Sequence, residues 1–188
     1  LGFTIDVACG GIDNMVRHHD YTLAIAESVS DKMFSRYWLH GAHLYVEGKK
    51  MSKSEGNMYY LKDLLEKGFS GAQIRFFLIY GFYRETLDFT FEKLTEVSRK
   101  LDAFKAMVND LQKANSSTSA EKVNALSKKI IPDFEASMNN DLAVKVAFDM
   151  LYQTINELHE FQGSLSAKDS KEIMRDLSRI DSVLQCIF

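Results

Sequence analysis

The sequence predicts a chain in two parts, an α/β part followed by an all-α part, and three patterns predict it. Residues 3–8 are a short β-branched run that ends in paired glycines, which is typical of a buried strand running into a turn. Residues 37–47 are a second run, rich in aromatic and aliphatic residues. From residue 91 onward, hydrophobic residues recur at alternating intervals of three and four, the period of an amphipathic helix.

Composition and charge restrict the kind of protein this is. A chain of 188 residues that is 46% hydrophobic can bury a substantial core. The formal net charge of -3 argues against a broad surface for nonspecific nucleic-acid binding, so any RNA contact must be local. The two cysteines, Cys9 and Cys186, do not form a disulfide scaffold, and no apolar run approaches the length of a membrane span. We therefore expect a soluble cytoplasmic protein with no membrane contact.

The first strand leads into a glycine turn at residues 9–13, with the sequence Cys-Gly-Gly-Ile-Asp. Gly10 and Gly11 would let the backbone approach a ligand, and in parallel α/β sheets ligands lie beyond the carboxyl ends of the strands. Asp13 is placed to accept hydrogen bonds from a ribose or an amine. A purely structural turn explains the same residues equally well.

A helix is expected over residues 18–29, with Tyr21, Ile25 and Val29 on one face. The second run, residues 37–47, predicts a strand or a strand pair. Its two histidines, His40 and His43, would lie on opposite faces of a regular strand and so cannot form one metal site. Packing and contact with an adenine ring remain as roles for them.

The most informative stretch is residues 49–57, with the sequence Lys-Lys-Met-Ser-Lys-Ser-Glu-Gly-Asn. Three lysines within five residues, with two serines and a Gly-Asn pair, predict a compact mobile loop that offers ammonium, hydroxyl and backbone N–H donors to one anion. A triphosphate is the natural guest, because lysine is a flexible point charge that can follow a phosphate as it leaves. The alternative is a solvated turn with surface lysines.

Two short helices should follow the loop, over residues 61–66 and 73–80, ended by Gly68 and Gly81. The second is apolar all round, so we expect it to be buried. It should help to hold the lysine loop against the body of the protein.

Beyond residue 91, three hydrophobic stripes predict long helices, and a fourth begins before Pro132, which kinks or ends it. The stripes consist of Leu94, Val97, Leu101, Phe104, Val108 and Leu111; of Val144, Phe148, Leu151, Ile155 and Leu158; of Ile173, Leu177, Ile180, Leu184 and Ile187; and of Val123, Leu126 and Ile130. They predict an antiparallel bundle of about four helices, joined by polar loops at residues 115–119 and 163–166. The bundle is either purely structural or a surface on which Lys122, Lys128 and Lys129 contact phosphate.

The lysine loop carries a resemblance to a known family. Residues 50–54, Lys-Met-Ser-Lys-Ser, are identical to the signature loop of class I aminoacyl-tRNA synthetases, and the flanks at residues 37–48 and 56–65 resemble the cysteinyl-tRNA synthetase family. The resemblance implies that residues 1–58 are the C-terminal part of a Rossmann-like nucleotide-binding catalytic domain. It implies a connective, stem-contact-like fold over residues 59–90 and an anticodon-binding helical bundle over residues 91–188.

The resemblance also implies partners and roles. The partners are ATP with Mg²⁺, an amino acid such as cysteine, and tRNA. ATP would be bound by Gly10, Gly11, Asp13, Lys50, Met51, Ser52, Lys53 and Ser54. Lys50 and Lys53 would be catalytic, neutralising charge on the departing pyrophosphate, with Lys53 the more important. The two serines would hold the loop conformation and Met51 would pack as its hinge.

The zinc site of that family is only partly present. His18 occupies the position of one zinc ligand, but Thr22 stands where the family has a glutamate, and Asp20 lies at the wrong spacing on a helix. Ala8 replaces a histidine that precedes the family's glycine turn. We therefore favour an ordinary histidine at a helix start for His18 over a zinc ligand, although Cys9 could serve as a second ligand. The missing ligands also weaken the case for cysteine as the substrate.

The second phosphate-binding signature of class I synthetases, His-Ile-Gly-His, does not occur in this sequence. We therefore expect the chain to be inactive alone and to need the missing N-terminal half of the catalytic domain, whether it is part of a longer polypeptide or a truncated paralogue. Three functions stay open: a cysteine–tRNA ligase, a non-catalytic paralogue that binds tRNA, nucleotide or protein, and a ligase that transfers activated cysteine to a small amine.

Overall fold

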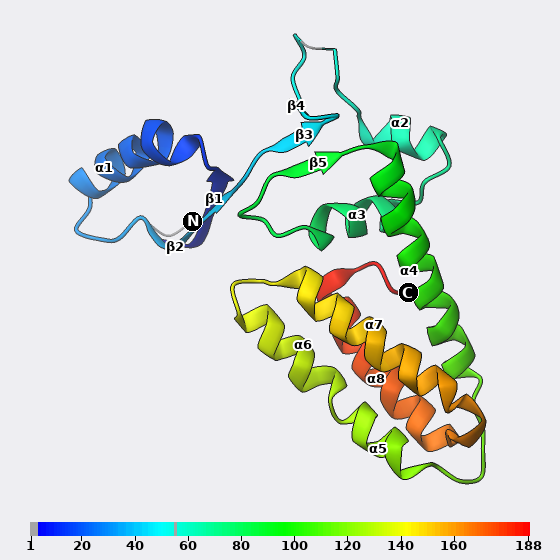
Figure 1. The fold of residues 1–188 in the computed structure, drawn as a ribbon. Helices are drawn as coiled ribbons and strands as arrows, with labels where there is room; N and C mark the ends of the chain where they lie inside the picture. The colour runs from blue at the N-terminus through cyan, green and yellow to red at the C-terminus, as the bar shows by residue number, and fades with distance from the viewer. Residues whose placement is uncertain (1–3, 55) are drawn as a thin grey trace. The chain divides into compact units, whose positions relative to one another are not determined.

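The computed structural model describes residues 4–54 and 56–188, which divide into two compact units (Figure 1). Unit 1 comprises the described residues of Leu1–Met58 together with Tyr83–Phe89, and unit 2 comprises Tyr59–Phe82 and Thr90–Phe188. The stretch 59–90, which the sequence groups into one connective fold, is thus divided between the two units.

Unit 1 begins with a parallel strand pair. Strand β1, Ile5–Gly11, pairs with β2, Ser35–Gly41, in a register that sets Val7 beside Tyr37 and Gly10 beside His40. The described part of β1 runs three residues further than the sequence predicts, because β2 continues alongside Cys9 and both glycines. The turn therefore follows Gly11 instead of starting at Cys9.

The connection between β1 and β2 is helical. It opens with a π-helical turn, η1, Met15–His19, and continues as α1, Asp20–Ser28. The helical segment starts three residues earlier than predicted. The expected apolar stripe is there, but Tyr21, Ile25 and Val29 are each about two-thirds or more exposed. The stripe therefore faces away from the rest of unit 1.

The second sheet of unit 1 has three short strands. Strand β3, Leu44–Val46, lies between β4, Lys49–Lys50, which is antiparallel to it, and β5, Leu87–Phe89, which is parallel. Glu47 and Gly48 both have positive φ, 52° and 76°, as a two-residue hairpin turn requires. The prediction that Lys49 and Lys50 belong to a mobile loop is therefore wrong, because the hairpin pairs both of them with β3.

Unit 2 starts with two helices close to their predicted bounds, α2, Leu61–Glu66, and α3, Gly71–Tyr80. Ser70 caps α3, and its hydroxyl accepts the N–H of Gln73. Ile74, Phe76 and Phe77 are buried, but Leu78 is 51% exposed, so α3 is not buried all round.

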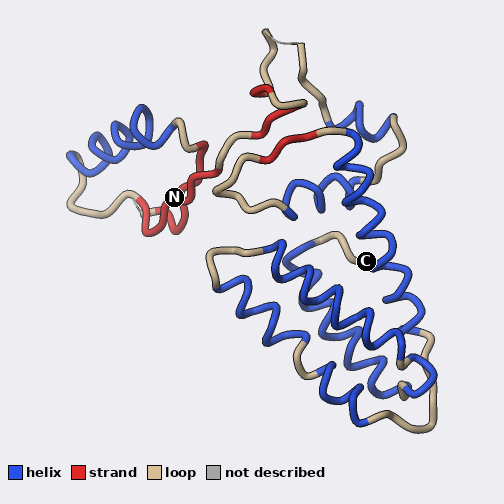
Figure 2. Tube along the Cα trace, in the orientation of Figure 1, coloured by secondary structure: helices blue, strands red, loops and turns tan. Residues whose placement is uncertain are grey.

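The rest of unit 2 is a bundle of five helices (Figures 1 and 2). They are α4, Phe91–Gln112; α5, Glu121–Ser127; α6, Ile130–Asn139; α7, Val144–Glu160; and α8, Ala167–Leu184, with a 3₁₀ turn, η2, Gln162–Ser164, before α8. The sequence predicts about four helices, and the difference arises at the fourth stripe. It breaks between Ser127 and Ile130, and Pro132 lies in the first turn of α6, where a missing N–H costs no intrahelical bond.

The predicted stripes supply the core of unit 2, which includes Leu101, Phe104, Phe148 and Leu177. Ile187, the last residue of the third stripe, is buried although it lies beyond α8. It is held there because Gln185 adopts a left-handed conformation and the Asp181 carboxylate accepts the N–H groups of the three residues that follow Gln185.

Within the described residues, no helix is both long enough and apolar enough to cross a membrane.

Candidate functional site

Asp13, His43 and Lys50 meet at one edge of unit 1. Asp13 lies just after β1, His43 lies in the turn between β2 and β3, and Lys50 ends β4. The Lys50 Nζ is 3.6 Å from the Asp13 Oδ2, and the His43 Nε2 is 3.9 Å from the same oxygen. The Asp13 and Lys50 side chains are 54% and 58% exposed, so a ligand in solvent can reach both groups. The structure thus brings together two of the site residues that the sequence predicts.

Gly11 makes room for the Asp13 carboxylate. A Cβ atom at Gly11 would lie 2.6 Å from the Asp13 Oδ1, closer than real Cβ contacts allow. The turn itself is fixed by a 2.9 Å hydrogen bond from the Ile12 N–H to the Gly41 carbonyl. The spacing Gly-x-Asp is therefore required by the local packing of the acid.

Gly10 faces a histidine. A Cβ atom at Gly10 would clash with the His19 ring, which occupies the space that the sequence leaves for a ligand. The His19 Nδ1 lies 2.8 Å from the His40 Nε2, and its ring also packs against Trp38 at a centroid distance of 4.9 Å. The packing role foreseen for His40 is thus found, whereas His19 and Trp38 were not singled out by sequence reasoning. The signal for Trp38 is its alternation with His40 on one face of a strand, whereas no local pattern points to His19.

An asparagine closes the loop that follows β4. The Ser52 N–H donates to the Asn57 Oδ1 at 2.9 Å, and the Asn57 Nδ2 donates to the Lys50 carbonyl at 3.3 Å. The hydroxyls of Ser52 and Ser54 lie 3.1 Å apart. Asn57 is therefore a structural residue of the loop, and the sequence shows it only as part of a Gly-Asn pair. The two serine hydroxyls lie within hydrogen-bonding distance of each other, and their role in holding the loop stays a prediction.

The other two loop residues with predicted roles lie in different environments. Met51 is partly buried, and its N–H points to the Leu44 carbonyl of β3 at 3.5 Å. Lys53 is exposed in the turn that follows. The loop thus holds one lysine, Lys50, on a strand and presents another, Lys53, to solvent. Residue 55 of this loop lies outside the described residues.

The groups near His18 do not fit a zinc ion. The Thr22 hydroxyl donates to the His18 carbonyl at 2.9 Å, so it bonds to the helix backbone. The His18 ring packs near the His19 ring, with centroids 5.6 Å apart. Throughout residues 4–54 and 56–188, no three His, Cys, Asp or Glu side chains gather closely enough to hold a metal.

Unit 2 contains a polar cluster on α3, α4 and α7. The Asp149 carboxylate accepts hydrogen bonds from the Tyr80 hydroxyl at 2.6 Å, from the Lys145 Nζ at 2.6 Å, and from the Lys100 Nζ. Partial burial opposes the charged form of Asp149, but these hydrogen bonds outweigh it and lower its pKa. The hydrogen bonds likewise outweigh the effect of burial on Lys100, so its pKa is raised.

The lysines that the sequence proposes as phosphate contacts lie around α5. Lys122 forms an ion pair with Glu157 at 3.7 Å and lies over the Phe161 ring. Lys128 and Lys129 occupy the break between α5 and α6. Lys122 is thus already engaged by groups of its own unit.

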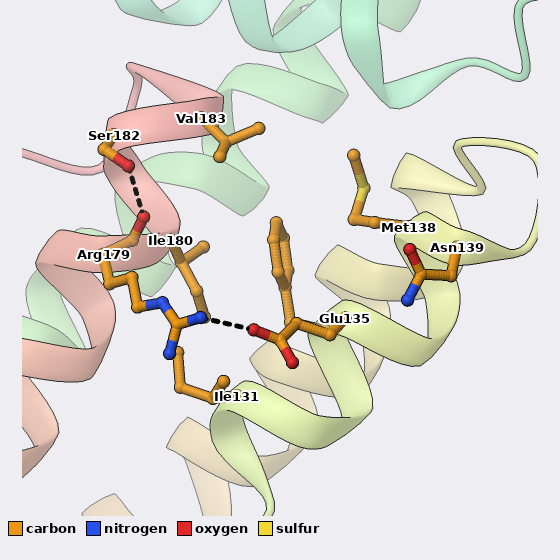
Figure 3. Close-up of a pocket in the computed structure, with 9 residues that line it drawn as sticks. Ile131, Glu135, Met138, Asn139, Arg179, Ile180, Ser182 and Val183 are labelled. Carbon is orange, nitrogen blue, oxygen red and sulfur yellow. Dashed lines mark hydrogen bonds and ion pairs between the residues drawn. The ribbon is translucent and has the colours of Figure 1, made fainter.

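A separate cavity of about 280 Å³ lies between α6 and α8 (Figure 3). Its lining is mostly apolar and includes Phe134, Met138 and Val183. The Arg179 guanidinium and the Glu135 carboxylate form an ion pair of 2.6 Å at its side. None of the site residues predicted from the sequence lines it.

Comparisons with known proteins give the chain a family. A family model described as the tRNA synthetases class I (C) catalytic domain matches residues 1–99. A cysteine–tRNA ligase of Chlamydia abortus is 38% identical over 193 residues, which cover 100% of this chain and 40% of the relative. A cysteine–tRNA ligase of Brachyspira hyodysenteriae is 33% identical over 189 residues, which cover 99% of this chain and 40% of the relative. The chain therefore spans about 40% of the length of these curated relatives.

A solved structure extends the likeness of fold to both units. It is a LeuRS from Agrobacterium radiobacter in a ternary complex with tRNA and LeuAMS, with a TM-score of 0.71, 14% sequence identity, and coverage of 95% of this chain and 26% of the other. At that identity, the likeness concerns the fold alone. On the match of residues 1–99, just over half of its length, the chain belongs to the family of class I (C) tRNA synthetase catalytic domains.

Proposed function

We propose that this chain supplies the lysine-loop part of the ATP site of a cysteine–tRNA ligase. The observation that carries the proposal is the 3.6 Å approach of Lys50 to Asp13, because it joins the start of the loop to the glycine turn at one solvent-accessible edge. The names of the relatives, cysteine–tRNA ligases, support the reaction class.

The chemistry requires positive charge that is placed where negative charge develops. An amino-acid carboxylate attacks the α-phosphate of ATP, the bond to the β-phosphate breaks, and pyrophosphate leaves with the electron pair. Lys50 and Lys53 neutralise that departing charge in addition to Mg²⁺ bound to ATP, and Lys53 is the more important because it matches the second lysine of the family's motif, which faces the phosphates. Removing one such donor from a comparable site costs about 3 kcal/mol, or roughly a hundredfold in rate.

We also propose that further polypeptide covers an exposed apolar face of the β1–β2 pair in unit 1. Ile5, Val7 and Tyr37 share one face of the β1–β2 pair and are all exposed. Parallel sheets are normally covered on both faces, so this face is suited to packing against additional elements. The N-terminal half of a class I catalytic domain is the segment that we propose for this position.

Unit 2 has a different part in the proposal. Residues 91–188 act as the tRNA-binding bundle, with residues 59–90 connecting them to the nucleotide-binding part. Recognition of unstacked bases would use aromatic and cationic side chains. Cysteine is the proposed amino acid on the strength of the relatives, although Ala8 and Thr22 replace family residues.

The test is amino-acid-dependent exchange of labelled pyrophosphate into ATP by the product of the complete reading frame. We expect exchange with cysteine, a loss of about a hundredfold in Lys53→Ala, and no change in Lys62→Ala, an exposed lysine on α2. An unchanged rate in Lys53→Ala would contradict the role of that lysine. Absence of exchange with every amino acid would favour the non-catalytic binding module instead.

A further inference from the structure

The ion pair between Asp13 and Lys50 places a carboxylate where a phosphate would have to bind Lys50. We propose that Asp13 is a positioning residue: it holds the Lys50 ammonium at the glycine turn until phosphate displaces it, and His43 then remains beside the Asp13 carboxylate. This inference rests on the proposed function, because it assumes that Lys50 leaves Asp13 to bind a phosphate of ATP.

The backbone around Lys50 is fixed, so only its side chain has to move. Lys50 pairs with Tyr45 across the β3–β4 hairpin, and the Asn57 side chain donates to its carbonyl. A lysine has a flexible four-carbon stem, so its ammonium can move while the strand stays in place. Because Gly11 leaves room for the Asp13 carboxylate, the acid can stay beside the turn during that movement.

The charges favour an easy exchange. Both Asp13 and Lys50 are more than half exposed, and ion pairs with that exposure contribute little because water and salt screen them. A triphosphate carries several negative charges and competes strongly with one carboxylate. The loss of Lys50 does not leave Asp13 without a neighbour, because the His43 Nε2 lies 3.9 Å from the same oxygen.

The first measurement detects the contact without any phosphate. With ¹³C-labelled lysine, the Lys50 ε-methylene signal is assigned by its loss in Lys50→Met. We expect this signal to shift in Asp13→Asn and to stay in place in Asp6→Asn. Asp6 is the matched control, because it is an exposed acid on β1 whose partner is Arg36 at 3.8 Å. A Lys50 signal that is the same in Asp13→Asn and in the wild-type chain overturns the proposal.

The second measurement uses inorganic tripolyphosphate, titrated calorimetrically into the product of the complete reading frame. Asp13→Asn removes the competitor of phosphate, so we expect its Kd to be about two- to fivefold lower than that of Asp6→Asn, which corrects for the general loss of one negative charge. In the Lys50→Met background, the difference between the two variants should vanish. Equal affinities in Asp13→Asn and Asp6→Asn, or no binding by the wild-type chain, overturn the proposal.

The two proposals fail in different ways. If Asp13→Asn behaves like Asp6→Asn while Lys53→Ala still lowers pyrophosphate exchange about a hundredfold, the proposed function stands and the role of Asp13 is wrong. If Asp13→Asn tightens tripolyphosphate binding through Lys50 while the complete protein exchanges no pyrophosphate, the partner exchange stands and the ligase function is wrong. Thermal unfolding of each variant identifies any change that comes from lost stability.

Discussion

The two units differ in how they are stabilised. Unit 2 has a continuous hydrophobic core that draws on α3 to α8, whereas the described residues of unit 1 bury only three hydrophobic side chains, Ala8, Val46 and Phe89. Unit 1 also exposes apolar side chains on β1, η1 and α1. The candidate site lies in the unit with the smaller core. The candidate site is therefore in the unit that is stabilised less by a hydrophobic core of its own.

The two cysteines show the same contrast. Cys9, on β1 of unit 1, is exposed. Cys186, which follows α8 in unit 2, is fully buried, and burial raises the pKa of its thiol to about 11. Its thiolate is therefore scarce at neutral pH, so Cys186 acts as a core residue and Cys9 is the thiol that reagents can reach.

The largest expected effect of a single substitution is at Phe148, a fully buried core residue on α7. Phe148→Ala removes contacts with the rings of Phe76 and Phe104 and leaves a cavity, so we expect a loss of about 3–5 kcal/mol in the free energy of unfolding. The matched change in unit 1, Ile25→Ala, alters a side chain that is 67% exposed, and we expect a change within about 0.5 kcal/mol.

Two optical probes separate the units in that experiment. Trp38, the one tryptophan of the chain, lies in unit 1 and reports on it by fluorescence. Circular dichroism reports mainly on the helices, most of which lie in unit 2. We expect Phe148→Ala to lower the urea concentration at the midpoint of the transition followed by circular dichroism. The midpoint followed by Trp38 fluorescence should not change. Equal shifts in both would show that the units unfold as one.

Most of unit 2 could be predicted from the sequence, because its helices each bury one stripe. The stripes that start at Leu94 and Val144 predict α4 and α7 correctly, since burial alternates with the helical period on a closed core. The split between α5 and α6 was missed. Val123 to Ile130 keeps a helical spacing across the break, so periodicity alone could not show that the chain turns at Lys128 and Lys129.

The site was predicted as a set of residues but not as an arrangement. The signature of residues 50–54 pointed to the loop, yet Lys50 turned out to be a strand residue because the Glu47-Gly48 turn pairs it with β3. The approach of Asp13 to Lys50 joins residues 37 positions apart, one in the turn after β1 and the other on β4, and no local pattern encodes it. The His19 ring over Gly10 is a similar case, since it depends on how η1 packs against β2.

The next effect tests packing inside unit 1. Gly10→Ala should push the His19 ring off the strand and break its hydrogen bond with His40. Overpacking of this kind costs about 1–3 kcal/mol, and the Trp38 fluorescence transition should detect it because His19 packs on Trp38. Gly163→Ala, in unit 2, is the control, because a Cβ there meets no atom within 4 Å. An equal effect of both substitutions would mean that backbone freedom is the cause instead of the clash with His19.

The smallest expected effect is that of Asp149→Asn in the polar cluster of unit 2. The way this effect changes with pH distinguishes a loss of charge from a loss of packing. Asp149→Asn should lower the free energy of unfolding by about 1 kcal/mol near pH 7, a modest value because the Asp149 and Lys100 side chains are about one-third exposed. The pKa of Asp149 is lowered, so its contribution is present above its ordinary pKa of 3.8 and is lost as pH falls through the folded value. The pKa of Lys100 is raised, so its contribution is present below 10.5 and is lost as pH rises through the folded value.

The difference between wild type and Asp149→Asn should therefore be constant from about pH 5 to pH 9 and should shrink at both extremes. Urea unfolding followed by circular dichroism across this range measures it. Glu66→Gln, which removes an exposed carboxylate paired with Lys62 on α2, should show no such plateau. A difference for Asp149→Asn that does not vary at the extremes would attribute the loss to packing, since only the charge of the cluster titrates there.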